Sequence, residues 1–394
     1  MTAVEARTAV ALGRREVTAL TALYAIAMKC TLVMPLIVVE LMRVLHLGEE
    51  VSTGLASLEV LGLMLGLLVS QILARWRWHV SPWLALLACL LGEGLTWLAS
   101  GAGGNVLPGP AVWYAGVGRV VAGLGAGWLV ARMAHALAGQ EQAEAWWGRV
   151  TAYGGLVMGA LMVVLSLAQG HPEHEWLFIG LALFVVVMAP VVAWLPEHVH
   201  GALSSSPDAV ARQAVGGSPR WWAALLAATF GIYFAMSGQW AVAGVIGARW
   251  GLAPDAIGLY LSLSVLGFVG AAVPGFLAGR LPERAVLAGV ALLWGASLLW
   301  FCNVRGGLHF AAAQTVMSTA FYIGTPYIFG RVSERDPDGT RVSWLVLLIL
   351  VALLVSTAVS GVAYAWAGPG AFSWMTAALG AGSLLLLASL RSDT

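Results

Sequence analysis

The sequence contains twelve apolar stretches of roughly 18 to 27 residues, each long enough to cross about 30 Å of hydrocarbon as a helix. Hydrophobic residues make up 60% of the chain and charged residues only 10%, whereas about 25% is usual for a soluble protein. The pattern predicts an all-α membrane protein with twelve transmembrane helices. We expect them at residues 17–42, 52–73, 82–100, 111–137, 146–168, 176–195, 221–246, 257–277, 285–302, 308–329, 342–366 and 371–390.

The polar segment 197–220 is the longest break between these stretches and divides them six and six. We therefore expect an N-terminal six-helix bundle at 1–196, a cytoplasmic linker at 197–220 and a C-terminal six-helix bundle at 221–394. If the amino terminus is cytoplasmic, 15 of the 20 Lys and Arg residues fall on the inside, 3 fall on the outside and 2 fall in the membrane. Cations concentrate in cytoplasmic loops. The distribution predicts that both termini are cytoplasmic and that the protein is a multi-pass protein of the inner cell membrane.

Four charged residues lie near the middle of predicted spans: Lys29, Glu59, Glu93 and Arg119. A charge at that depth costs a few kcal/mol, so such residues usually face a wet cavity or neutralise one another. Counted along their helices, all four lie at one depth. One interpretation is a static network that stabilises the N-terminal bundle. We favour the other, in which a carboxylate exchanges a proton and a cation holds substrate. Glu40, near the outer end of the first span, is expected to reach water.

The chain carries an internal repeat. Residues 70–77, which include Arg75 and Arg77, match residues 275–284, which include Gly275, Arg280 and Arg284, at an offset of 205. These segments resemble the basic loop motif that the major facilitator superfamily (MFS) repeats after its helices 2 and 8. Ala74 and Gly279 stand where that motif usually has Asp. The resemblance implies the MFS fold of two pseudo-symmetric six-helix bundles, with these loops acting in gating.

A second resemblance lies in the fourth and fifth spans. Arg119 is followed by Gly123, Gly125 and Gly127, which is similar to the helix-4 signature of proton-coupled members of the family. Gly155 and Gly159 are similar to the antiporter signature of helix 5, although Ala160 stands where that pattern has Pro. Small residues let membrane helices approach closely, so packing between helices alone also explains these glycines.

In that fold, helices 1, 4, 7 and 10 line the central cavity, so the resemblance implies that Lys29 and Arg119 contact substrate. We expect Glu59 to carry the proton, with Glu93 as a second proton-coupling candidate or a structural partner. Helical spacing also places polar and aromatic residues on one face of spans seven and ten, namely Tyr233, Trp240, Gln314 and Tyr322. They are expected cavity walls, or they only bond neighbouring helices. Pro35 and Pro326 are expected to break helices near the site.

Other functions have little support in the sequence. A net charge of +1 with dispersed cations argues against nucleic-acid binding. No cofactor or metal site is expected, because the candidate histidines, such as His171, His174, His198 and His200, lie in loops. The sequence therefore predicts a proton-coupled secondary transporter of a small organic solute, a monomer that works by alternating access in the lipid bilayer. Export of an amphipathic compound is favoured. Uptake of an organic anion or metal chelate is the alternative, and a membrane-embedded enzyme or a non-transporting receptor is more remote.

Overall fold

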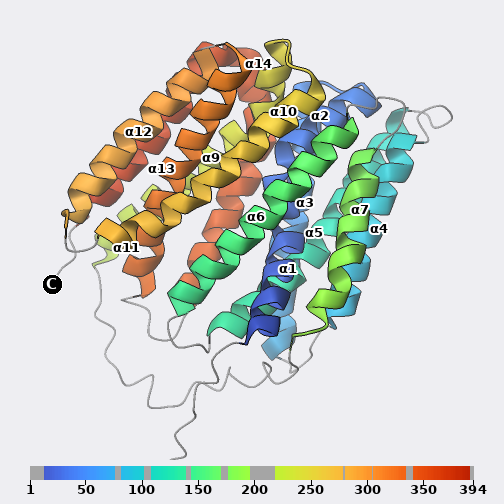
Figure 1. Cartoon of the computed structure of the whole chain (residues 1–394), viewed down its shortest axis with the longest axis horizontal. Coiled ribbons are helices and arrows are strands. Elements are labelled where there is room, and N and C mark those ends of the chain that lie inside the picture. Colours follow the sequence, from blue (N-terminus) through green and yellow to red (C-terminus); the bar gives the residue numbers. More distant parts are fainter. Residues whose placement is uncertain are drawn as a thin grey trace, which may run out of the picture.

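The computed structural model describes residues 13–75, 81–101, 108–138, 143–169, 176–195, 218–277, 280–303, 305–333 and 340–390, and this part of the chain is almost entirely helical. Figure 1 shows long helices lying side by side along one common direction. The N-terminal helices are α1 (Arg14–Leu32), α2 (Met34–Leu45), α3 (Glu49–Arg75), α4 (Pro82–Gly101), α5 (Pro108–Ala138), α6 (Ala143–Gln169) and α7 (Trp176–Val192). The C-terminal helices are α9 (Pro219–Arg249), α10 (Pro254–Ser262), the 3-10 helix η3 (Leu263–Ala272), α11 (Val273–Leu277), α12 (Glu283–Asn303), α13 (Gly307–Ser333) and α14 (Thr340–Ser389).

Each of the twelve predicted ranges is helical over most of its length. In the described part, eight helices are long and apolar enough to cross a membrane, or nine if α1 and α2 count as one bent span. The protein is therefore a multi-pass membrane protein. That all twelve stretches cross the bilayer, with both ends on the cytoplasmic side, remains a prediction. Arg77 and residues 197–217 of the expected linker lie outside the described residues, as do His171, His174, His198 and His200.

Four predicted spans differ in detail from a single straight helix. The first is broken at Val33, where α1 and α2 meet at 51°, because Pro35 has no N–H to continue the helical ladder. The eighth is divided among α10, η3 and α11. The last two are joined in α14, which bends at Gly368 with a φ of 75° that favours glycine. The break expected at Pro326 is absent, since α13 continues through that residue.

Close helix contacts in the N-terminal half occur at glycine. A side chain at Gly123 would meet the carbonyl of Glu59 on α3, and one at Gly127 would meet the carbonyl of Leu63. Gly125 faces α4 on the other side of α5, against Ala85 and Cys89. These three glycines therefore allow α5 to fit between α3 and α4. Their spacing places the neighbouring charged residues within reach of one another.

The N-terminal and C-terminal helices meet through α2 with α9, α3 with α14, and α6 with α10 and η3. Gly244 of α9 lies against the carbonyl of Pro35, and Gly361 of α14 lies against Thr53 and the carbonyl of Glu49. These contacts gather toward the end of the molecule where α2 ends and α10 begins, at the top of Figure 1. Gly155 and Gly159 of α6 contact Phe268 and Val265 of η3 farther along the same interface.

Candidate functional site

The four charged residues at one predicted depth are in direct contact. Lys29 of α1 donates from Nζ to Glu59 Oε1 at 2.7 Å and also to Glu93 Oε1. Arg119 of α5 donates from one terminal nitrogen to Glu59 Oε2 at 2.6 Å and from the other to Glu93 Oε2. Each carboxylate, Glu59 on α3 and Glu93 on α4, therefore accepts from both cations. We call this closed ring of four side chains the charge quartet.

The charge quartet is isolated from solvent, because each of its side chains is at most 1% exposed. Its formal charges sum to zero, and Arg119 makes two further contacts: Nε donates to Thr96 Oγ1 at 3.1 Å, and the guanidinium lies 5.1 Å from the centre of the Phe178 ring. Removing one member would leave an uncompensated charge in a medium of low dielectric constant, which is strongly unfavourable. The quartet is thus stable as a whole and sensitive to any change in its charge.

Neither cation of the charge quartet lies on an exposed wall. In the second half of α1, Tyr24, Met28 and Thr31 are partly exposed at helical steps of four and three, as is Leu32 at the helix end, whereas Lys29 is 1% exposed. Arg119 is fully buried. The structure therefore places Lys29 and Arg119 inside the N-terminal helices, on a different face of α1 from the residues that border the space between the two halves.

Tyr233 and Tyr322 belong to an aromatic cluster of the C-terminal half. Tyr233 of α9 packs edge to face on Phe321 at 5.1 Å, and Tyr322 of α13 stacks on Phe268 of η3 at 4.0 Å. Both tyrosines are half-buried, and Tyr24 of α1 lies near both of them. The cluster thus joins residues from both halves of the chain and offers hydroxyl groups on an apolar surface.

Gln314 has a partner that the sequence reasoning missed. Gln239 of α9 donates from Nε2 to Gln314 Oε1 at 3.0 Å, and both side chains are fully buried. Gln239 Oε1 and Gln314 Nε2 have no partner, so one acceptor and one donor of the pair remain unpaired. A glutamine in the middle of an apolar span is itself the signal that would have singled out Gln239. The pair can offer two complementary polar atoms to a hydroxyl group.

Trp240 does not border an open cavity. Its indole N–H donates to the backbone carbonyl of Thr31 at 2.8 Å, and the side chain is 9% exposed. Thr31 follows Lys29 by two residues and lies at the break between α1 and α2. Trp240 therefore connects the C-terminal half to the helix that carries one member of the charge quartet.

The repeated loop motif contains an ion pair at its second copy. Arg331 of α13 donates to Glu283 at 2.9 Å and to the carbonyl of Leu387 at 2.6 Å, which joins α12, α13 and α14. Arg280 is exposed and lies over the Phe276 ring at 4.2 Å, and Arg284 is exposed. Gly275 lies in α11 and Arg75 is the last residue of α3. The role of Glu283 was not predicted from the sequence, although this residue lies within the motif.

The expectation that Glu40 reaches water is wrong. Glu40 is 2% exposed, and its Oε1 accepts a hydrogen bond at 2.7 Å from a terminal nitrogen of Arg43, whose side chain is partly exposed. A carboxylate can stay buried near a helix end because a cation three residues later neutralises it.

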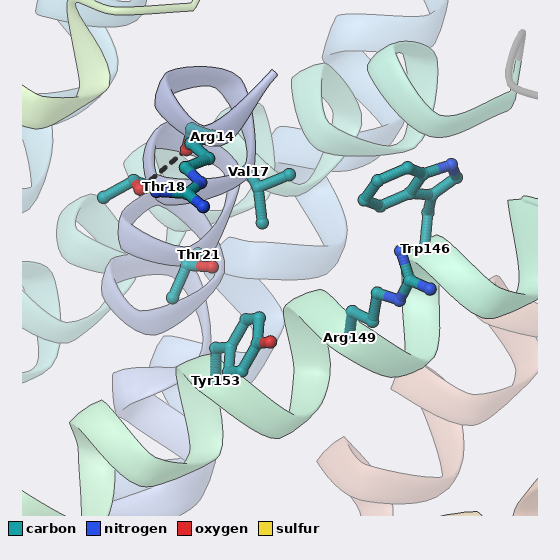
Figure 2. Close-up of a pocket in the computed structure, with 7 residues that line it drawn as sticks. All are labelled: Arg14, Val17, Thr18, Thr21, Trp146, Arg149 and Tyr153. Atoms are coloured by element: carbon teal, nitrogen blue, oxygen red, sulfur yellow. Dashed lines mark hydrogen bonds between the residues drawn. The ribbon is translucent and has the colours of Figure 1, made fainter. Parts of the chain in front are cut away.

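A cavity of about 500 Å³ lies between the first turns of α1 and α6. Figure 2 shows its lining residues on these two helices, and they are Arg14, Val17, Thr18, Thr21, Trp146, Arg149 and Tyr153. This end of the molecule is opposite the end where the two halves meet, at the bottom of Figure 1. Within the described ranges, no group of three or more His, Cys, Asp or Glu side chains could hold a metal ion.

No protein-family model and no curated protein sequence matches the chain. Solved structures do match it over nearly its whole length. The xylose transporter XylE from E. coli, in a partially occluded inward open conformation, is 13% identical with a TM-score of 0.65, covering 94% of this chain and 96% of XylE. The human organic anion transporter MFSD10 (TETRAN) is 18% identical with a TM-score of 0.63, covering 95% of this chain and 99% of MFSD10.

The E. coli fucose:proton symporter FucP is 17% identical with a TM-score of 0.57, covering 96% of this chain and 98% of FucP. All three are described as transporters or symporters, and none as an enzyme. Identities this low establish the arrangement of the helices rather than a shared substrate. The chain has the fold of the major facilitator superfamily transporters.

Proposed function

We propose that the protein is a proton-coupled secondary transporter that moves a small organic solute across the inner cell membrane by alternating access. The observation that carries this proposal is the charge quartet, a closed and neutral ring of two cations and two carboxylates with no access to water. A proton added to either carboxylate leaves two cations with one anion. The ring must then rearrange or recruit another anion.

Glu59 is the better proton carrier of the two carboxylates. It lies on α3, which contacts α14 of the C-terminal half, whereas Glu93 lies on α4, whose main contacts are α5 and α7 of its own half. A change at Glu59 can therefore reach the interface between the halves through one helix. In this mechanism Glu93 holds Lys29 and Arg119 in place while the charge on Glu59 changes.

We propose that residues 1–196 and 221–394 move as two bundles about a central site, with 197–220 as the cytoplasmic linker. Tyr233, Gln314 and Tyr322 supply the substrate contacts of the C-terminal half. Trp240, which was expected among them, connects that half to α1 instead. Protonation of Glu59 would leave Lys29 and Arg119, still held by Glu93, with one anion too few, so they would attract an anionic or electron-rich group of the substrate. The aromatic cluster and the sparse polar atoms suit an amphipathic compound, and we favour its export by a monomer. The two cations favour an organic anion as the second candidate substrate, taken up with protons as in a symporter.

Reconstitution tests this proposal. The protein is placed in liposomes that contain a pH-sensitive dye, a pH gradient is imposed, and a panel of amphipathic drugs and organic anions is screened for solute-dependent proton movement. With an active solute, Glu59→Gln should abolish transport driven by the pH gradient and retain counterflow exchange. Glu50→Gln, which neutralises an exposed carboxylate of the same helix, is the control and should keep both activities. Gradient-driven accumulation by Glu59→Gln, or no solute-dependent proton movement across the panel, would contradict the proposal.

A further inference from the structure

Among the described residues that line the cavity between α1 and α6, two are cations and none is a carboxylate. Arg14 comes from the first turn of α1 and Arg149 from the second turn of α6, and both are exposed. Figure 2 shows both side chains bordering the same space. Arg149 lies over the Trp146 ring at 4.7 Å, which holds the guanidinium beside an aromatic face. The cavity is therefore positively charged on two sides.

A buried hydroxyl group without a partner also lines this cavity. Thr21 is 8% exposed, and its Oγ1 makes no hydrogen bond. Thr18, one turn earlier, donates to the carbonyl of Arg14 at 2.8 Å, as threonines in helices commonly do. Figure 2 shows the Thr21 hydroxyl directed toward the α6 side of the cavity. Buried polar atoms are rarely left unpaired, so this hydroxyl points to a ligand atom that completes it.

The same face of α1 continues from this cavity toward the centre of the protein. Arg14, Thr18 and Thr21 are followed at helical spacing by Tyr24, which packs on Gly154 of α6 and lies near Tyr233 and Tyr322. The next residues of this face, Met28 and Thr31, are also partly exposed. A solute bound at Arg14 and Arg149 is therefore at the start of a continuous face that leads to the aromatic cluster.

We infer that the cavity of Arg14, Thr21, Trp146, Arg149 and Tyr153 is a docking site for the anionic group of an amphipathic compound. The two guanidinium groups bind the anion, Thr21 donates a hydrogen bond to it, and the rings of Trp146 and Tyr153 contact its apolar part. A volume of about 500 Å³ accommodates a small organic molecule. This inference deepens the proposed function by naming the substrate class and its first binding site. The anionic group can belong to a free solute or to a lipid headgroup, and the experiment separates these sources.

The test is a binding measurement without any pH gradient. The full chain in phosphatidylcholine nanodiscs is titrated with naphthalene-2-sulfonate and with the neutral naphthalene-2-sulfonamide, using calorimetry. The sulfonate should bind more tightly, and its affinity should fall with added salt because exposed charges are screened. Arg14→Gln and Arg149→Gln should each weaken sulfonate binding by roughly threefold or more. Thr21→Val, which keeps the side-chain shape but removes the hydroxyl group, should also weaken sulfonate binding. Thr21→Ser, which keeps the hydroxyl group, should retain the affinity of the parent.

Arg15→Gln is the matched control, since Arg15 is exposed on the same turn of α1 but does not line the cavity. Equal affinity for sulfonate and sulfonamide, or equal losses in Arg15→Gln and Arg14→Gln, would overturn the inference. If phosphatidylglycerol in the nanodisc competes with the sulfonate, the site binds a lipid headgroup. If it does not compete, the site binds a soluble anion. Sulfonate binding at Arg14 and Arg149 is measured without a pH gradient and solute-driven proton movement is measured with one, so a failure of this site and a failure of proton coupling are distinguishable.

Discussion

Trp240 supplies the hydrogen bond that Thr31 cannot receive from its own helix. The carbonyl of Thr31 would normally accept from the N–H four residues later, but that residue is Pro35, which has none. The indole N–H of Trp240, on α9, donates to this carbonyl at 2.8 Å. Gly244, one turn later on α9, lies against the carbonyl of Pro35. The break in the first span thus becomes an attachment point between the two halves, two residues after Lys29.

Trp240→Phe should weaken the contact between the two halves at the end where α2 ends and α10 begins, which we call the closed end. The substitution keeps an aromatic ring and removes the donor, so the Thr31 carbonyl stays buried without a partner while the halves remain together. That costs about 1–3 kcal/mol, which shifts the population between closed and open conformations by about 5- to 150-fold. Spin labels attached at Glu50 and Ala253, exposed near this contact in the two halves, should report a larger fraction of long distances.

The control for this measurement is Trp113→Phe, because Trp113 is 78% exposed and has no role in the interface. An unchanged distance distribution in Trp240→Phe would show that the hydrogen bond does not hold the closed end.

The ion pair of Arg249 and Glu49 joins the same end. Arg249 donates to Glu49 Oε1 at 2.6 Å, with Arg249 42% exposed and Glu49 14% exposed. Partly exposed pairs contribute at most about 1 kcal/mol, so Arg249→Gln should hardly change thermal stability. It should increase the open fraction seen by the same spin labels. The exchange Glu49→Arg with Arg249→Glu should return the distances toward the parent. An increase that the exchange does not reverse would mean that Arg249 acts through another contact, such as the Tyr364 ring at 4.6 Å.

Gly123 and Gly94 provide a matched pair for the packing interpretation. A methyl group at Gly123 would collide with the backbone carbonyl of Glu59, whereas nothing lies within 4 Å of one at Gly94. Gly123→Ala should therefore destabilise the protein by about 1–3 kcal/mol through overpacking. Gly94→Ala should raise stability by about 0.5–1 kcal/mol, because alanine favours the helix. Thermal unfolding of the two variants in detergent checks both signs, and a stable Gly123→Ala would show that α3 and α5 can separate without cost.

The depth of the buried charges was predictable, but their orientation was not. Rise per residue placed Lys29, Glu59, Glu93 and Arg119 at one level, and the structure joins all four. The fold resemblance then implied that Lys29 and Arg119 face the cavity. A helix position fixes depth within a fraction of a turn, whereas the face depends on how each helix is rotated against its neighbours. That rotation is set by close contacts such as Gly123 on the Glu59 carbonyl, which hydropathy does not reveal.

The contacts between the two halves were also beyond the sequence reasoning. Pro35 predicted a break, and the break is present. Its partner Trp240 lies 209 residues away in sequence, and nothing local connects the two. Gln239 was missed for a related reason, since its pairing with Gln314 depends on the packing of α9 and α13. Long-range pairs of this kind follow from tertiary structure, so a single sequence gives only the residues that need partners.

A double-mutant cycle on Lys29 and Glu59 tests whether the charge quartet only stabilises the fold or also carries the proton. Lys29→Gln or Glu59→Gln alone leaves one unbalanced charge in a buried ring, and each should cost about 3–5 kcal/mol. The double variant retains Arg119 and Glu93 as a neutral pair, so its loss of stability should be smaller than the sum of the two single losses by more than about 1 kcal/mol.

Lys29→Gln with Glu40→Gln is the control cycle. It also conserves net charge, but its residues are 11 positions apart along the bent first span, roughly 16 Å at the helical rise, and should be additive. Thermal unfolding gives the stabilities, and dye-filled liposomes give proton-coupled transport. A refolded double variant that lacks gradient-driven transport assigns the proton to this ring, whereas one that still transports would reduce the four charges to a support for the helices.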